Sequence, residues 1–117
     1  MIHPLLWLRA FAITVGIEEL IAVPLLRSAE PSLPRRIGAV FVANLATHPL
    51  VWFFFPHLGW SYGVFIVVAE TWAVGLEIVV YALFAKGARL STCTAASALA
   101  NAGSYILGLV AMRMGLI

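Results

Sequence analysis

The chain has 117 residues, of which 63% are hydrophobic and only 10% are charged, and its formal net charge is +2. A soluble domain carries roughly 45–50% apolar and about 25% charged residues, so a fold exposed to water would lack the polar residues to cover its surface. The composition therefore excludes a soluble globular domain and a disordered chain, and the single cysteine excludes a disulfide scaffold. The basic residues are too few and too dispersed to follow a nucleic-acid backbone, so we expect no nucleic-acid partner.

Four stretches are long and apolar enough to cross a bilayer, which requires about 20 residues of helix. They cover residues 5–26, 37–55, 60–85 and 94–112. The segments between them are rich in the residue types that are typical of turns, and the last helix has three candidate N-cap residues: Ser91, Thr92 and Thr94. We therefore expect an all-α polytopic membrane protein, in which residues 1–117 form a single transmembrane domain as a four-helix bundle.

The loops between the predicted spans differ in charge. Segments 27–36 and 86–89 contain five of the seven Lys and Arg residues, whereas segment 56–59 contains none. We expect the protein to lie in the cell (inner) membrane. Basic loops remain on the cytoplasmic side of such a membrane, so both basic segments are expected there and both termini on the outer side. Four aromatic residues then fall near the outer interface, where such residues are enriched: Trp7, Trp52, Trp60 and Tyr62.

The first span contains two adjacent carboxylates, Glu18 and Glu19. A charge at the centre of a membrane helix costs ~2.5–3.5 kcal/mol, and each Leu, Ile, Phe or Val returns only ~0.3–0.6 kcal/mol. For this span, the cost of inserting two ionised carboxylates is about equal to the free energy that the apolar residues return. We therefore expect the helix to insert only beside other helices that satisfy or neutralise its carboxylates.

Polar side chains recur in every predicted span at two neighbouring depths, as judged from a helical rise of about 1.5 Å per residue. The layer nearer the basic loops contains Glu18, Glu77, Asn44 and Asn101. The second layer, roughly one and a half turns further away, contains His48, Glu70, Ser104 and Tyr105. We interpret the two layers, together with Glu19 and Thr47, as one buried polar site.

Two short patterns occur twice in the chain. Gly16-Ile-Glu18 matches Gly75-Leu-Glu77, and Ala43-Asn44-Leu-Ala-Thr47 matches Ala100-Asn101-Ala-Gly-Ser104. The matches predict two tandem helical hairpins, residues 5–56 and 60–113, related by a pseudo-two-fold axis along the membrane normal. In that arrangement, Glu18 with Asn44 and Thr47 would face Glu77 with Asn101 and Ser104.

Carboxyl groups that face each other in apolar surroundings favour a bound proton or a bound cation. We therefore expect a small transporter or ion-translocating protein, coupled to protons or cations, that forms a homodimer or larger oligomer in the lipid bilayer. Glu18 and Glu77 would bind the proton, ion or small-molecule substrate. Four neutral side chains would orient these two carboxylates: Asn44, Asn101, Thr47 and Ser104. His48 and Glu70 would pass the proton or ion on towards the outside.

Two other functions remain open at this stage. The first is an intramembrane enzyme that acts on a lipid or polyprenyl substrate, with His48 and Glu70 as acid and base. Such an enzyme would either need no cofactor or hold a divalent metal, for which the candidate ligands are Glu18, Glu77, His48 and Glu70. The Glu-x-x-His spacing of di-iron bundles is absent. The second is a structural subunit whose carboxylates pair with Arg or Lys from a partner's helices.

Overall fold

The structure, a computed structural model, describes residues 4–85 and 89–116. In this part of the chain there are four long helices and no strand, which confirms the predicted all-helical class. The helices are α1 (Pro4–Leu25), α2 (Leu33–Pro49), α3 (Tyr62–Phe84) and α4 (Leu90–Arg113). Two short helical segments, η1 (Leu50–Phe54) and η2 (Phe55–Leu58), connect α2 to α3.

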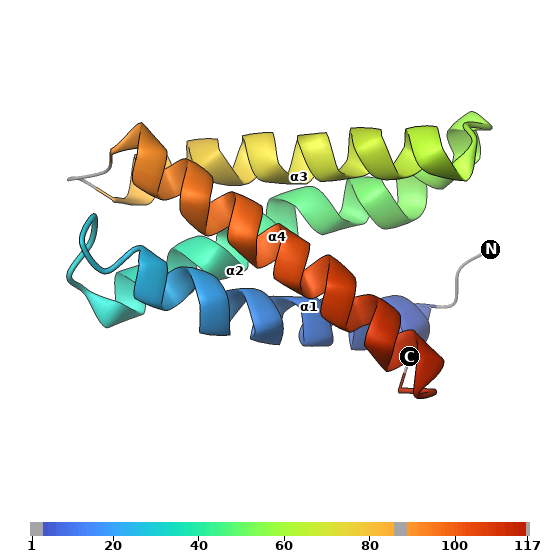
Figure 1. Cartoon of the computed structure of the whole chain (residues 1–117), viewed down its shortest axis with the longest axis horizontal. Helices are drawn as coiled ribbons and strands as arrows, with labels where there is room; N and C mark the ends of the chain where they lie inside the picture. Colours follow the sequence, from blue (N-terminus) through green and yellow to red (C-terminus); the bar gives the residue numbers. More distant parts are fainter. Residues whose placement is uncertain (1–3, 86–88, 117) are drawn as a thin grey trace.

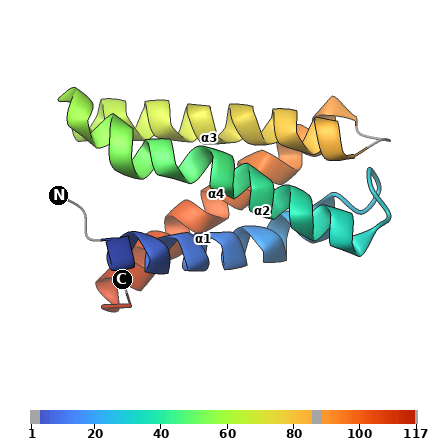
Figure 2. The same ribbon diagram turned by 180° about the vertical axis from the view of Figure 1, so that it is seen from behind.

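The four helices surround a common interior. Helices α1 and α3 run in the same direction along two sides of the bundle, while α2 and α4 run back across them on opposite faces (Figures 1 and 2). Both α1 and α3 pack against α2 and against α4. Because of this ring of contacts, α1 lies opposite α3, and the inner faces of all four helices meet along the bundle axis.

The two ends of the bundle differ in chemistry. The end that we call the basic end holds the α1–α2 and α3–α4 connections, with Arg27, Arg35, Arg36 and Arg89 (Figure 1). The opposite end holds η1, η2, the start of α1 and the end of α4. The four aromatic residues predicted for one interface, including Trp7 and Trp60, all lie near this opposite end. Lys86, which the sequence assigns to a basic loop, lies outside the described residues.

Three helical segments of the described chain are long and apolar enough to cross a membrane: Leu33–Leu58, Tyr62–Phe84 and Leu90–Arg113. Helix α1 is not among them, because every 18-residue stretch of it contains Arg9, Glu18 and Glu19. The outer face of α1 is nevertheless apolar, and Leu20 on this face is 80% exposed. Its carboxylate Glu18 is only 1% exposed and points into the bundle, so α1 separates an apolar outer face from a polar inner one.

The predicted span 37–55 lies within one helical segment, Leu33–Leu58, but the type of helix changes along it. The α-helical pattern stops at Pro49, and the π-helical turn η1 and the 3-10 turn η2 follow it. Proline has no N–H and cannot donate to the carbonyl of Leu45, so the regular hydrogen-bond ladder is interrupted there. Gly59, with φ of 73°, then ends η2 in the left-handed conformation that favours glycine.

The predicted N-caps of the last helix are wrong. Helix α4 begins at Leu90, about one turn earlier than expected, and its N-cap, Arg89, makes no side-chain capping bond. Thr94 lies inside the helix, where its hydroxyl donates to the Leu90 carbonyl at 2.8 Å. A threonine hydroxyl can bond the carbonyl four residues earlier, and this contact replaces the capping role that its position suggested.

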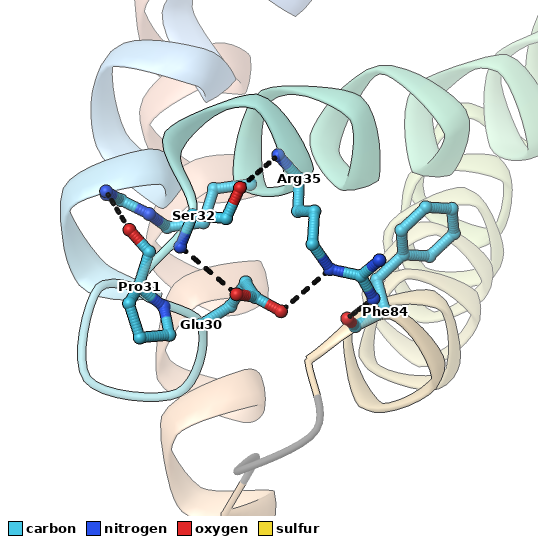
Figure 3. A network of polar contacts seen from close by, with 6 residues as sticks. Glu30, Pro31, Ser32, Arg35 and Phe84 are labelled. Atoms are coloured by element: carbon cyan, nitrogen blue, oxygen red, sulfur yellow. Dashed lines mark hydrogen bonds and ion pairs between the residues drawn. The ribbon is translucent and has the colours of Figure 1, made fainter.

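Two arginines at the start of α2 hold the basic end together (Figure 3). The Arg35 guanidinium donates to the carbonyl of Phe84, the last residue of α3, at 2.6 Å. Glu30 accepts from the same guanidinium at 2.8 Å and fixes its position. Arg36 donates to the carbonyl of Val23 near the end of α1 at 2.7 Å. Because helix C-termini carry partial negative charge, these contacts tie α1, α2 and α3 to one another at this end.

Candidate functional site

A cavity of about 380 Å³ enters the bundle from the opposite end and reaches its middle. Its rim includes Pro56, Tyr62 and Met112, which are exposed. Its floor includes Glu18 and Glu77, which are 1% and 0% exposed. All four helices contribute to the lining, so the carboxylates of two different helices meet in one space.

Glu77 is held at the floor by two donors. The Asn101 side-chain amide donates to Glu77 Oε1 at 2.9 Å, and the Tyr81 hydroxyl donates to the same oxygen at 3.3 Å. Asn101 Nδ2 also donates to the Ser97 carbonyl at 2.9 Å, which fixes the amide. One oxygen of Glu77 is thus bound to donors of the protein, whereas the buried Oε2 has no partner among the described residues.

Glu18 is held in a similar way from the other side of the floor. The Ser104 hydroxyl donates to Glu18 Oε2 at 2.9 Å. The depth estimate placed Ser104 in the second layer, but α4 crosses the bundle diagonally and brings this hydroxyl down to the first (Figure 1). As in Glu77, the second oxygen, Oε1, is buried and has no partner among the described residues.

The two carboxyl groups also lie within hydrogen-bonding reach of each other. Two ionised carboxylates would repel at this separation, and a hydrogen bond between them requires that one carry a proton. Each residue offers one oxygen that no described donor occupies, Glu18 Oε1 and Glu77 Oε2. The geometry therefore suits a pair of carboxyls that share one proton.

The two asparagines of the site are held by equivalent contacts. Asn44 Nδ2 donates to the carbonyl of Val40 at 2.9 Å, as Asn101 Nδ2 does to that of Ser97. The Thr47 hydroxyl donates to the Asn44 carbonyl at 3.4 Å, and the Ser104 hydroxyl donates to the Asn101 carbonyl at 3.1 Å. The orientation of each amide is thus fixed by its own helix, and Asn44 is left with an unpartnered, buried Oδ1.

The other predicted site residues occupy different places. His48 and Glu70 line the cavity and are half-buried. The His48 ring packs edge-to-face on Phe11 at 5.3 Å and lies parallel to Trp52 at 6.3 Å. Glu19, by contrast, is half-buried but does not line the cavity. The structure therefore brings together all of the predicted site residues except Glu19.

The described residues give little support to a metal centre. Within residues 4–85 and 89–116, no three His, Cys, Asp or Glu side chains are arranged as the ligands of a metal ion. Glu18, Glu77, His48 and Glu70 line the same cavity but do not form such a set. His48 and Glu70, the predicted acid–base pair, both line the cavity, and among the described residues no hydrogen bond joins them.

The sequence reasoning missed two parts of the site. Tyr81 is fully buried and bonds Glu77, and its position four residues after Glu77 on the same helix face was the available signal. The cavity walls are the second part, because they are largely aromatic. Tyr105 was predicted in the second layer of the site, but three other rings of the walls were not, and they have no common spacing in the sequence: Trp52, Tyr62 and Phe65.

Between the cavity floor and the basic end, the interior is closely packed. We call this layer the basic-end seal and define it by four residues that are at most 1% exposed: Ala22, Leu26, Val40 and Tyr81. Small residues of α2 and α4 pack around it. None of the four lines the cavity. The site is thus accessible from the opposite end and closed towards the basic end.

No protein-family model matches the chain, and no curated protein or solved structure matches it either. The interpretation of the site therefore depends on its own geometry and chemistry. The features that any function has to explain are a cavity that opens at one end, two facing carboxyls at its floor, and a seal beneath them.

Proposed function

We propose that this protein is a small membrane transporter that exchanges a proton for a cation. The observation that carries the proposal is the position of Glu18 and Glu77. They lie at the closed end of a cavity, within hydrogen-bonding reach of each other, and each has a free oxygen. Such a pair holds one proton, or one cation in its place, but not both.

The proposal treats α1 as a fourth crossing beside the three apolar spans. Its outer face is largely apolar, and Ser104 of α4 donates to one oxygen of Glu18, so a partner helix satisfies part of one of the two carboxylates that would oppose insertion. The second carboxylate, Glu19, is half-buried, and its Oε2 has no partner among the described residues. The basic end, with its Arg residues, is then cytoplasmic, and both termini lie outside. In this orientation the cavity opens to the outside, and the basic-end seal closes it towards the cytoplasm.

We also propose that the two hairpins are related by a pseudo-two-fold axis, and the positions of their buried residues support this part of the proposal. Six buried positions of α2 recur in α4 at a constant offset: Arg36, Ala39, Val40, Ala43, Asn44 and Thr47 correspond to Cys93, Ala96, Ser97, Ala100, Asn101 and Ser104. In the odd helices, Ala10, Glu18 and Ala22 correspond to Ala69, Glu77 and Tyr81 in the same way. An axis along the bundle would bring the two carboxyls face to face.

Exchange requires that the site open alternately to the two sides. In the described state the seal and the Arg35 and Arg36 contacts keep the basic end closed. Breaking those contacts while the opposite end narrows would expose the same carboxyls to the cytoplasm. The interrupted helix at Pro49 is a natural point for such a movement, because its hydrogen-bond ladder is already discontinuous. Four helices enclose only a short pathway, so we propose that the working unit is a homodimer or larger oligomer.

A structural-subunit function receives less support. The carboxylates of such a subunit would pair with Arg or Lys from a partner protein. In this structure, Glu18 and Glu77 accept hydrogen bonds from Ser104 and Asn101 of the same chain. An enzyme that used His48 and Glu70 as acid and base would leave the facing pair of Glu18 and Glu77 at the cavity floor without a role.

The proposed pathway can be tested by blocking the cavity. Ile66 lines the cavity, whereas its neighbour Val67 is 66% exposed on the outer surface of α3 and does not. Ile66→Cys protein is reconstituted into liposomes that enclose a pH-sensitive dye, and gradients of inorganic and organic cations are imposed. We expect a cation gradient to drive protons in the opposite direction, and a bulky, membrane-impermeant thiol reagent added from the cavity side to stop this movement.

The matched control is Val67→Cys, which should keep its proton movement after the same treatment. The native Cys93 is fully buried and should not react. Comparing each sample before and after the reagent removes any effect of the substitution on folding. Proton movement that continues after Ile66→Cys has been fully modified would contradict the proposed pathway, and protein that moves no protons under any cation gradient would contradict the proposed function.

A further inference from the structure

We infer that the exchanged cation is a protonated organic amine with an apolar body about the size of an aromatic ring. This inference rests on the proposed exchange function and specifies its substrate. It follows from three properties of the cavity: the unpartnered acceptors at its floor, the aromatic character of its walls, and the sign of its charge.

Three residues that line the floor each have a buried oxygen atom that accepts no hydrogen bond from a described donor. These atoms are Glu18 Oε1, Glu77 Oε2 and Asn44 Oδ1. All three side chains are at most 1% exposed. Once the proton shared by Glu18 and Glu77 leaves, all three acceptors lack a donor. Buried polar atoms are nearly always hydrogen-bonded, so the ligand that replaces the proton has to supply donors. A primary ammonium group supplies three N–H donors and no acceptor, which matches this set.

The cavity is much larger than an ammonium group. Its volume of about 380 Å³ is more than twice the roughly 150 Å³ of a cavity that holds benzene, and it lies within the usual range of ligand pockets. The upper walls are formed by Trp52, Phe65 and Tyr105, beside Ile66 and Leu109. Such walls favour an apolar body, and their ring faces attract positive charge. A bare inorganic ion would leave most of this space unfilled.

The charged groups around the cavity select for a cation. The titratable side chains that face it come from all four helices: Glu18 from α1, His48 from α2, Tyr62, Glu70 and Glu77 from α3, and Tyr105 from α4. Among the described residues, no Lys or Arg lines it. When one ammonium ion replaces the proton shared by Glu18 and Glu77, the net charge of the floor does not change. The pair carries a net charge of −1 in both states, so a one-for-one exchange adds no further uncompensated charge to the interior of the bundle.

The test measures binding and proton release together, on purified full-length protein in mild detergent at neutral pH. The probe is benzylammonium, and calorimetry reports its binding while a pH indicator reports released protons. We expect it to bind and to release one proton per chain. Benzyltrimethylammonium keeps the charge and the ring but has no N–H donor, so it should bind at least about tenfold more weakly. Benzyl alcohol, benzoate and sodium ions should release no protons.

Two matched variants test the wall. Trp52→Leu removes an aromatic face from the cavity and should weaken benzylammonium binding by about tenfold. Trp72→Leu makes the same change on α3 at a residue that does not line the cavity, and its binding should equal that of the original protein. Equal losses in both variants would overturn the wall's role in recognition.

The other outcomes separate this inference from the proposed function. If sodium ions release the proton and drive exchange in liposomes while benzylammonium does neither, the exchange function stands and the amine assignment is wrong. Equal binding of benzyl alcohol and benzylammonium would also overturn the assignment, because charge would then play no part. If no cation of either kind moves protons in the liposome assay, the proposed function fails, and the amine assignment fails with it.

Discussion

Replacing Glu77 with glutamine should abolish cation-driven proton movement, with a loss of about 100-fold or more in the exchange rate. Glutamine keeps the size of the side chain and can still accept from Asn101 and Tyr81, so the floor of the cavity should remain folded. It cannot take up or release a proton, and with Glu18 it can no longer form a pair of carboxyls that shares one. Glu18→Gln should have the same effect, because both members of the pair are needed.

The measurement is proton flux in the dye-loaded liposomes, with circular dichroism and gel filtration as checks of folding. Glu19→Gln is the matched control, since Glu19 is the adjacent residue on α1 and does not line the cavity. It should retain most of the flux. A Glu77→Gln protein that is folded and still exchanges protons at the original rate would show that the pair is not the proton site.

Replacing Tyr81 with alanine should convert the exchanger into a proton leak. Tyr81 is the largest fully buried side chain and forms the centre of the basic-end seal beneath Glu77. Removing a large buried aromatic ring costs about 3–5 kcal/mol of stability and leaves a cavity. Because this cavity would lie between polar groups and the basic end, water could enter it and connect the floor to the cytoplasm.

The leak appears in liposomes as proton movement that follows a pH gradient when no cation gradient is imposed. Tyr81→Phe separates the two contributions of the residue, since it keeps the ring but loses the hydrogen bond to Glu77 Oε1. We expect the Tyr81→Phe liposomes to hold a pH gradient as the original protein does. If liposomes with folded Tyr81→Ala protein hold a pH gradient as well as those with the original protein, the seal must lie elsewhere in the bundle.

Hydropathy and charge were enough to predict the helical class and the approximate limits of each helix. These patterns are local, because a membrane helix needs an apolar stretch of a certain length and little else. The detail that failed, the N-cap of the last helix, is also local, but it depends on competing hydrogen bonds. Thr94 bonds a carbonyl within α4 instead of capping the helix.

The predicted polar site depended on a different kind of signal. Carboxylates are costly in a membrane, so Glu18 and Glu77 were expected to share an interior, and the structure places both at one cavity floor. The sequence could not show that Glu18 lines the cavity and Glu19 does not, because the direction of each side chain depends on how α1 is rotated in the bundle. The aromatic walls depend on packing between helices, and the depth of Ser104 depends on the diagonal course of α4.

The central claim is that Glu18 and Glu77 share one proton at the cavity floor, and infrared spectroscopy tests it most directly. Spectra of the protein with isotope-labelled glutamate, recorded at neutral pH, are compared with those of the Glu18→Gln/Glu77→Gln double variant. The account predicts that the difference contains one protonated carboxyl and one carboxylate, and that an exchanged cation removes the protonated signal. A difference that contains two carboxylates and no protonated carboxyl, unchanged by any cation, would contradict it.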